Sequence, residues 1–552
     1  MRDPLSCNGR ANVICSNRIS PIAQKYLSFL PPGVENNFIG STSERNVYRV
    51  LLTRFDQNWS EKHRSFFRFS RSHRDEEDEN TARINNGVRI NGRNGTRGNM
   101  GGVFDHVWTK SGKTILNIRA GYTRFRQTRN QMAEQDANPA ALGFSQTALS
   151  VFGDRQGIPR FNIGGITSPV EQTGLVTIPR TTSVQPTMTR IFGSHSTRFG
   201  YDFRVYQENR SPVEFKLGEL QFNNNITRLN DQNPAIPVDQ NRAQSIASLL
   251  LGIPTGGSIP LTPPSSYQSL YQGLFFQDDW KVSRRLTLNL GLRYELEGAT
   301  TERFNRNLRG FDLTSSNPVE AAAKAAYAAN PIPEFPAANF NVKGGLLFTS
   351  QAQRGFYDSD TNNFQPRLGF AYQINEKTVI RGGLAMYTFP YPLEAINATG
   401  FASSTPIDPT PDLGLTFTAS LANPYPNGRI APTGSSRGLA TFLGQSINVV
   451  PTNLRNGQSA KLELNLQREL PGRWLAEITY VGNRGYDLTT TVDLNPIPRQ
   501  FLSTSPVRDQ AQINFLTANV TNPIPNIEDL RGTAFYTATN LKRQQLFRPY
   551  PK

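Results

Sequence analysis

The sequence has no long hydrophobic run. Its densest apolar cluster, residues 248–251, is followed by Gly252 and Pro254, far short of the ~18–20 apolar residues that a membrane-spanning helix needs. This excludes a helical membrane protein, but strands that cross a bilayer carry a much weaker signal. Residues 1–7 also lack the apolar core of a secretory signal. We therefore expect either a chain that stays in the cytoplasm or part of a longer precursor.

Apolar and charged residues are both scarce. Hydrophobic residues make up 37% and charged residues 18% of the 552 positions, against the usual ~45–50% and ~25%. Asn, Gln, Ser, Thr, 44 Gly and 38 Pro take up the difference, and Gly, Pro, Asn and Thr are poor helix formers. The aromatic content of 10% argues against disorder. The composition favours a β-rich chain with long loops.

Cysteine is nearly absent, and the charge is of one sign. Cys7 and Cys15 could form a small disulfide loop in an oxidising compartment or stay as two free thiols, and their spacing allows both. The formal net charge is +16. However, the arginines are scattered at strand alternation rather than clustered in a recognisable nucleic-acid-binding module. We therefore expect no nucleic-acid partner.

A unit of strand, short polar turn, strand and long irregular segment occurs six times. One strand, residues 286–297, alternates strictly, and this period of two specifies a strand rather than a helix. Its apolar face consists of Leu286, Leu288, Leu290, Leu292, Tyr294 and Leu296, and its opposite face of Thr287, Asn289, Gly291, Arg293, Glu295 and Glu297. The irregular segments are about 71–101, 126–187, 207–266, 298–363, 390–459 and 484–552. An Ala-rich stretch at 318–330 predicts a short helix within one of them.

The difference in loop length between the two hairpin ends is typical of outer-membrane β-barrels, which have short periplasmic turns and long extracellular loops. The sequence therefore predicts an all-β, antiparallel, up-and-down transmembrane barrel of about twelve strands, each ~9–11 residues long. Apolar faces would meet lipid and polar faces the lumen. Aromatic residues expected in the interfacial girdles are Trp108, Trp280, Trp474, Tyr387 and Tyr480. The expected division is a lead-in segment at 1–46, the partial barrel at 47–483 and a long loop at 484–552.

Two short motifs resemble enzyme signatures without their required context. Residues 111–114 look like the end of a P-loop, but Val107 stands where that motif needs Gly, so a polar hairpin turn is expected. Residues 434–438 match G-x-S-x-G but lack the preceding strand and following helix of a nucleophile elbow. We expect neither catalytic residues nor a bound cofactor, and the chain is not predicted to be an enzyme.

Metal sites are not expected either. The four histidines, His63, His73, His106 and His195, show no ligand spacing. The acidic run at 75–79 lacks the Gly-spaced loop of a calcium site and is expected to be a solvated loop. Residues 278–280, Asp-Asp-Trp, form the sharpest motif, and we interpret them as structural residues at a periplasmic turn.

Several strands resemble those of TonB-dependent receptors, and among these the Oar-like barrels that follow a carboxypeptidase-regulatory-like domain and a plug. The resemblance is most specific at 273–282 and 286–295, with further matches at 363–372, 378–383, 466–470 and 480–485, and it covers roughly residues 17–552. It implies a ~22-stranded outer-membrane barrel with an internal plug. It also implies energy from an inner-membrane TonB complex.

The sequence lacks several features that the family pattern includes. It shows no TonB box, plug or N-terminal β-sandwich, and about twelve strands instead of about twenty-two. We therefore expect an internal piece of an uptake receptor for an unidentified solute. Its expected partners are outer-membrane lipid, the missing plug and strands, and the TonB complex. The alternative is a surface protein whose long loops mediate adhesion, because fold alone does not settle function.

Overall fold

One large antiparallel sheet dominates the computed structural model, which describes residues 6–30, 43–79, 84–85, 88–89, 93–166, 173–214, 217–227, 238–389, 398–410, 416–530 and 534–550. The sheet follows the chain as an up-and-down meander, with β16 (Thr301–Glu302) pairing beside β14. Its strands are β3 (Ser43–Asn58), β4 (His63–Glu79), β7 (Arg93–Ser111), β8 (Thr114–Gln131), β10 (Thr173–Phe192), β11 (His195–Glu214), β14 (Ser265–Lys281), β15 (Leu286–Glu297), β19 (Asn363–Asn375), β20 (Thr378–Thr388), β22 (Gln458–Leu470) and β23 (Trp474–Tyr486). The prediction of an all-β antiparallel architecture is confirmed.

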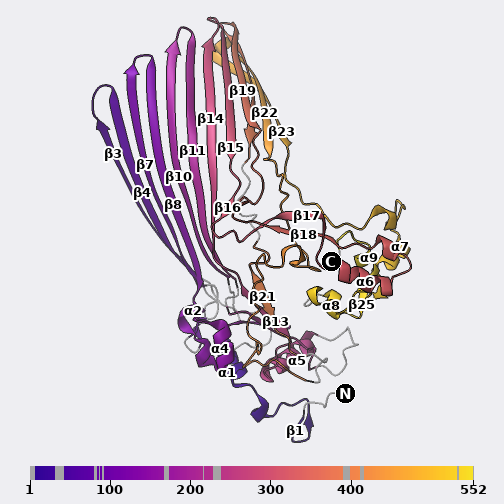
Figure 1. The fold of residues 1–552 in the computed structure, drawn as a ribbon. Coiled ribbons are helices and arrows are strands. Elements are labelled where there is room, and N and C mark those ends of the chain that lie inside the picture. Colours follow the sequence, from indigo (N-terminus) through magenta and orange to yellow (C-terminus); the bar gives the residue numbers. More distant parts are fainter. Residues whose placement is uncertain are drawn as a thin grey trace.

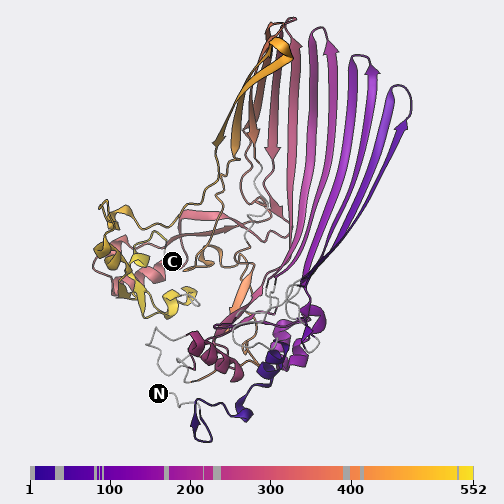
Figure 2. The same cartoon turned by 180° about the vertical axis from the view of Figure 1, so that it is seen from behind.

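The sheet is an open fan rather than a closed barrel (Figure 1). Its two edges are β3 and β23, and among the described residues neither edge pairs with a further strand. The short hairpin turns gather at one end of the fan, and the remaining elements lie at the other end (Figures 1 and 2). The hairpin turns therefore separate cleanly from the long connections, as the sequence predicted.

Most strands are longer than expected, and β20, with 11 residues, is the one sheet strand among the main twelve within the expected length. β10 and β11 each have 20 residues and β7 has 19, so the expected length of ~9–11 residues was wrong for these strands. The segment 71–101, expected to be irregular, contributes to β4 and β7. Polar cross-strand contacts continue the ladder there: Arg49 lies 3.3 Å from Asp75, and Arg97 lies 3.1 Å from Glu76. Apolar alternation marks only the apolar part of each strand, so it could not indicate these polar extensions.

The segments before β3, between the hairpins of the large sheet and after β23 are folded rather than extended. They contain the helices α1 (Pro21–Phe29), α2 (Ala133–Asp136), α3 (Pro139–Leu142), α4 (Gln146–Phe152), α5 (Val238–Leu250), α6 (Glu320–Ala329), α7 (Gln510–Thr517), α8 (Ala534–Thr537) and α9 (Arg543–Leu546). They also contain the strands β1 (Ser6–Cys7), β2 (Arg10–Ala11), β5 (Ile84–Asn85), β6 (Val88–Arg89), β9 (Arg160–Ile163), β12 (Glu219–Phe222), β13 (Gly256–Leu261), β17 (Leu308–Ser316), β18 (Lys343–Phe348), β21 (Ser403–Pro406), β24 (Asn519–Thr521) and β25 (Asn540–Lys542). No helix in the described part of the chain is long and apolar enough to span a membrane.

A first apolar core joins five distant chain segments below the sheet (Figure 1). Helix α1 begins where the Ser20 side chain accepts a hydrogen bond from the backbone N–H of Ala23, with Pro21 in the first turn. Its buried face includes Tyr26, which stacks on Phe161 of β9 at 4.1 Å between ring centroids. The short sheet β21-β13-β12-β9 and helices α3, α4 and α5 complete this loop-end core.

A second core contains α6 and the C-terminal helices α7 and α9. The predicted helix at 318–330 is confirmed as α6, and its Tyr327 stacks on Phe340 at 4.1 Å with nearly parallel rings. Residues from the segment 484–552 supply Leu516, Phe535 and Phe547 to this core. That segment thus folds on α6, and the domain division given above stays a prediction.

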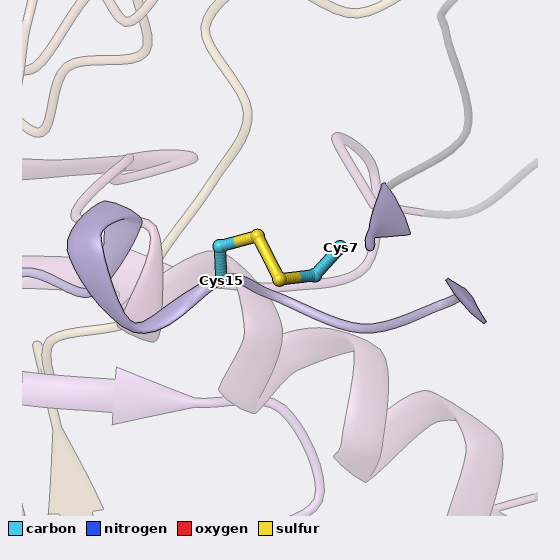
Figure 3. The surroundings of a disulfide bond; sticks show 2 residues. All are labelled: Cys7 and Cys15. Carbon is cyan, nitrogen blue, oxygen red and sulfur yellow. A yellow bond between two sulfur atoms is a disulfide. The ribbon is translucent and has the colours of Figure 1, made fainter. Parts of the chain in front are cut away.

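The two cysteines are bonded. Cys7 and Cys15 form a disulfide with an S–S distance of 2.03 Å, which closes a small loop over the β1–β2 hairpin (Figure 3). There is no free cysteine in the part of the chain that the structure describes. The structure thereby decides between the two states that the spacing allowed.

The first core generates a stability prediction. Phe161 is buried between Tyr26 and Phe222, so Phe161→Ala should lower the free energy of unfolding of this core by about 3–5 kcal/mol. Native-state proteolysis across a urea series measures that change. Phe417→Ala, at a side chain that is 40% exposed, is the matched control and should change it little. Equal losses from the two variants would show that the loop-end residues do not form a cooperative core.

Candidate functional site

The register of the large sheet separates its residues into two faces. Residues directly opposite in neighbouring strands share a face, and Phe276, Leu292, Leu290 and Leu368 pair in this way across β14, β15 and β19. Leu290 and Leu292 are 37% and 48% exposed. The same face carries other exposed apolar side chains, including Phe55, Phe67, Phe104, Val184, Phe199, Leu274, Phe364, Phe370, Leu384, Leu464 and Ile478. A continuous band of apolar side chains thus crosses this face from β3 to β23, and the same register places Asp278 of β14 opposite Leu290 on that face.

The opposite face carries a charged network at its centre. The Asp202 carboxylate of β11, which is 9% exposed, accepts hydrogen bonds from Arg204 at 2.8 Å and from Arg293 Nη2 at 3.2 Å. Arg293 also donates to Glu295 from Nε and to the Tyr271 hydroxyl from Nη2, both at 2.6 Å. The network therefore connects β11, β14 and β15 through groups that are half-buried and paired.

Further side chains extend the polar face on both sides of this network. Asp105 of β7 accepts from Asn117 at 2.9 Å and from Arg119 at 2.8 Å, both of β8. Near the other edge, Asn465 of β22 donates to Glu477 of β23 at 2.5 Å. Paired ions and amides of this kind suit a face that borders water and are costly in hydrocarbon. The arrangement is that of a wall with one lipid-compatible face and one hydrated face.

Comparison with known protein families agrees with a sheet that has one apolar and one polar face. The family model described as the outer membrane beta barrel domain matches residues 2–551. The chain belongs to this family. No curated protein matches it. As an outer-membrane β-barrel domain, the chain is a protein of the outer membrane, and its family is one of membrane barrels rather than enzymes.

Solved structures similar to this barrel domain come from outer-membrane receptors and transporters. They include the alcaligin receptor FauA from Bordetella pertussis, with 9% identity, a TM-score of 0.38, and coverage of 82% of this chain and 45% of that chain. The transporter YddB from Escherichia coli has 10% identity, a TM-score of 0.39, and coverage of 79% and 40%. The siderophore receptor PiuA from Acinetobacter baumannii has 11% identity, a TM-score of 0.36, and coverage of 79% of this chain and 50% of that chain. This chain spans half or less of each of those proteins.

The histidines of the barrel domain form pairs that the sequence did not indicate. His63 Nδ1 lies 3.3 Å from His106 Nε2, and His106 Nδ1 lies 2.7 Å from the Ser65 hydroxyl. His195 Nδ1 lies 2.7 Å from Asp278 Oδ2. These partners come from different strands, so only the register brings them together. Across the described ranges, no group of three or more His, Cys, Asp or Glu side chains is suited to a metal ion.

The motifs singled out in the sequence have ordinary structural settings in the barrel domain. Residues 111–114 form the turn between β7 and β8, and residues 434–438 lie in turns without a preceding strand. The acidic run at 75–79 is part of strand β4, so the expected solvated loop was wrong; Asp75 pairs with Arg49 there. Asp279 accepts a hydrogen bond from Asn289 at 2.5 Å and precedes Trp280, which was expected in the girdle.

Tryptophans mark the end of the sheet that carries the short turns. Trp59 lies in the β3–β4 turn, Trp108 and Trp280 near the ends of β7 and β14, and Trp474 at the start of β23. Tyr387 does not belong to this set. Its ring contacts Arg367 at 5.2 Å and Lys461 at 5.3 Å on the polar face. The expected girdle position of Tyr387 was wrong because the period of two places its side chain on the polar face.

A basic pair lies away from the sheet, next to the first core. Burial lowers the pKa of both Arg155 and Arg429, and the neighbouring charge of Arg155 lowers the pKa of Arg429 further. The Nε and Nη2 atoms of Arg429 are buried without a hydrogen-bond partner in the described structure. Burial also raises the pKa of the adjacent Tyr425. The loop end therefore has a positive, poorly solvated site of its own.

Proposed function

We propose that this outer-membrane β-barrel domain is the barrel wall of a TonB-dependent receptor that takes up a solute. The observation that supports this is the continuous separation of an apolar face from a face with paired ions. A pure surface anchor needs only the apolar face, whereas a transport path also needs a hydrated interior. The Oar-like subgroup is proposed from the resemblance of residues 273–282 and 286–295 alone.

The chain is proposed to act within a larger barrel. The open edges of β3 and β23 would expose backbone donors and acceptors to lipid at several kcal/mol each. Further strands would pair with these edges, and a plug would occupy the interior and connect the receptor to the TonB complex. The whole would be a barrel larger than the described sheet, and the chain as it stands would be incomplete.

An adhesion function is the alternative, and one observation favours it. The long connections form two packed cores instead of open loops, so they present a preformed surface at one end of the sheet. Preformed surfaces bind partners without a large ordering cost. In this alternative no solute passes, and the apolar face serves only to hold the protein in the membrane.

Solute uptake distinguishes the two functions. Cells that lack the gene should leave in the medium a solute that wild-type cells remove, and cells that lack TonB should show the same defect. Mass spectrometry of the spent medium measures this loss. If uptake is unchanged in both strains while attachment to surfaces or neighbouring cells falls, the adhesion function is correct and the transport proposal fails.

The proposed orientation places the short turns in the periplasm and the packed cores outside the cell. A peptide tag inserted after Lys377, in the β19–β20 turn, should react with antibody only after the outer membrane is permeabilised. A tag after Val507, which is 73% exposed near the second core, should react on intact cells. Labelling of the Lys377 tag on intact cells would reverse the orientation.

A further inference from the structure

A hollow of about 220 Å³ on the polar face is lined by three arginines. Arg198 of β11, Gln277 of β14, Gly291 of β15 and Arg367 of β19 stand directly opposite one another and form a single row across four strands. Arg293 lies two residues further along β15, opposite Phe275. The row therefore places Arg198 on one side of Gly291 and Arg367 on the other. Arg293 adds a third cation on the same strand as the glycine.

One glycine leaves the space open, and a second accommodates the aromatic ring beside it. A Cβ at Gly291 would meet nothing closer than 3.5 Å, from Arg367 Cβ and the Phe276 carbonyl, so the position is open above the backbone. A Cβ at Gly200 would come within 2.8 Å of Phe275, because the Phe275 ring lies over that glycine. The hollow is consequently bordered by the Phe275 ring on one side and by the bare backbone of Gly291 at its base.

The guanidinium groups at this hollow retain hydrogen-bonding capacity. No carboxylate in the described ranges lies within ion-pair distance of Arg198 or Arg367. Arg293 uses Nε and Nη2 in the network with Glu295, Tyr271 and Asp202, and its Nη1 has no hydrogen-bond partner among those residues. Arg198 and Arg293 lie 5.9 and 5.8 Å from the Phe275 ring, which holds both side chains beside the space.

The distance between the arginines at this hollow determines which shape of anion they can bind. Arg198 and Arg367 are separated by three strand spacings, about 14 Å between backbones at ~4.8 Å each. A compact phosphate is best held by donors that converge on one point, whereas charges spread along a row match an elongated molecule with several carboxylates. Arginine forks bind carboxylates through paired hydrogen bonds, and Phe275 offers contact to a carbon skeleton.

We propose that this arginine hollow binds a polycarboxylate, carried either by a small solute or by acidic side chains of a polypeptide inside the barrel. The inference rests on the proposed function in one respect, since it assumes that the polar face is the inner one. It deepens that function by naming the chemical class that the wall recognises. The basic row continues to Lys461 of β22, two strands beyond Arg367, so a longer anion meets a fourth cation.

Binding is tested with outer membranes from cells that express the full chain, with protein amounts matched by immunoblotting. Radiolabelled propane-1,2,3-tricarboxylate is one ligand, a short capped peptide with three glutamates is the second, and inorganic phosphate is the comparison. We expect saturable binding of at least one carboxylate ligand, weaker at high salt because the contacts are ionic. Arg198→Gln and Arg367→Gln should each weaken it about tenfold or more.

The controls separate a specific site from general basicity. Arg381→Gln removes an arginine of β20 on the same face that bonds Gln467 outside the hollow, and it should leave binding unchanged. Gly291→Val fills the hollow without removing charge and should abolish binding, while proteolysis patterns confirm that the variant is folded. Preference for the tricarboxylate identifies a solute as the source, and preference for the peptide identifies a polypeptide.

Several results would overturn the inference. These are no binding of either carboxylate, equal binding of phosphate, or equal losses from Arg198→Gln and Arg381→Gln. A failure of the proposed function would look different. In that case carboxylate binding and its dependence on Arg198 and Arg367 would persist, while TonB-dependent uptake would be absent.

Discussion

The antiparallel ladder is the constraint on which this molecule depends. Inside a bilayer every backbone donor and acceptor needs a partner, and long paired strands supply those partners without water. Once the backbone is paired in this way, side chains must alternate between two faces. A register that is continuous from β3 to β23 then converts twelve separate alternating patterns into one apolar surface and one polar surface. A shift of one residue in a single strand would mix the two faces.

The polar face shows how the sheet holds charge. Asp202 is shared between Arg204 and Arg293, and Glu295 is shared between Arg293 and Tyr271. Each carboxylate thus has more than one donor, which is what a half-buried charge requires. At the arginine hollow, in contrast, the cations outnumber the nearby anions. We interpret that imbalance as a property of the site rather than of the fold, since the surrounding network is balanced.

Much of the wall could be predicted from sequence because its signals are local. Three patterns each predict one element without reference to the rest of the chain. They are the alternation in residues 286–297, the turn residues at 375–377 and the Ala-rich stretch that forms α6. Other features could not be predicted because they depend on the register between distant strands. This class includes the His63–His106 pair, the position of Tyr387 on the polar face and the row from Arg198 to Arg367.

The packed cores at the loop end illustrate a second limit of sequence-based prediction. Their apolar residues are dispersed through segments rich in Pro, Gly and Asn, so no window has a clear period. Tyr26 and Phe161 are 135 positions apart in the chain, and only the strands between them bring them to one place. Turn-rich segments were therefore expected to be irregular, although together they contain enough apolar side chains to form cores.

The central claim is that the alternation in β15 separates lipid from water. Leu290→Arg places a charge on the apolar face and should lower the free energy of unfolding from liposomes by ~2–4 kcal/mol near the bilayer midplane. Asn289→Arg places the same charge on the polar face and should fold nearly as well as the unmodified chain. Folding yields of both variants in liposomes, measured in parallel across a urea series, provide the test. A clear deficit for Leu290→Arg alone is the predicted result, and equal yields for the two variants would contradict this account of the sheet.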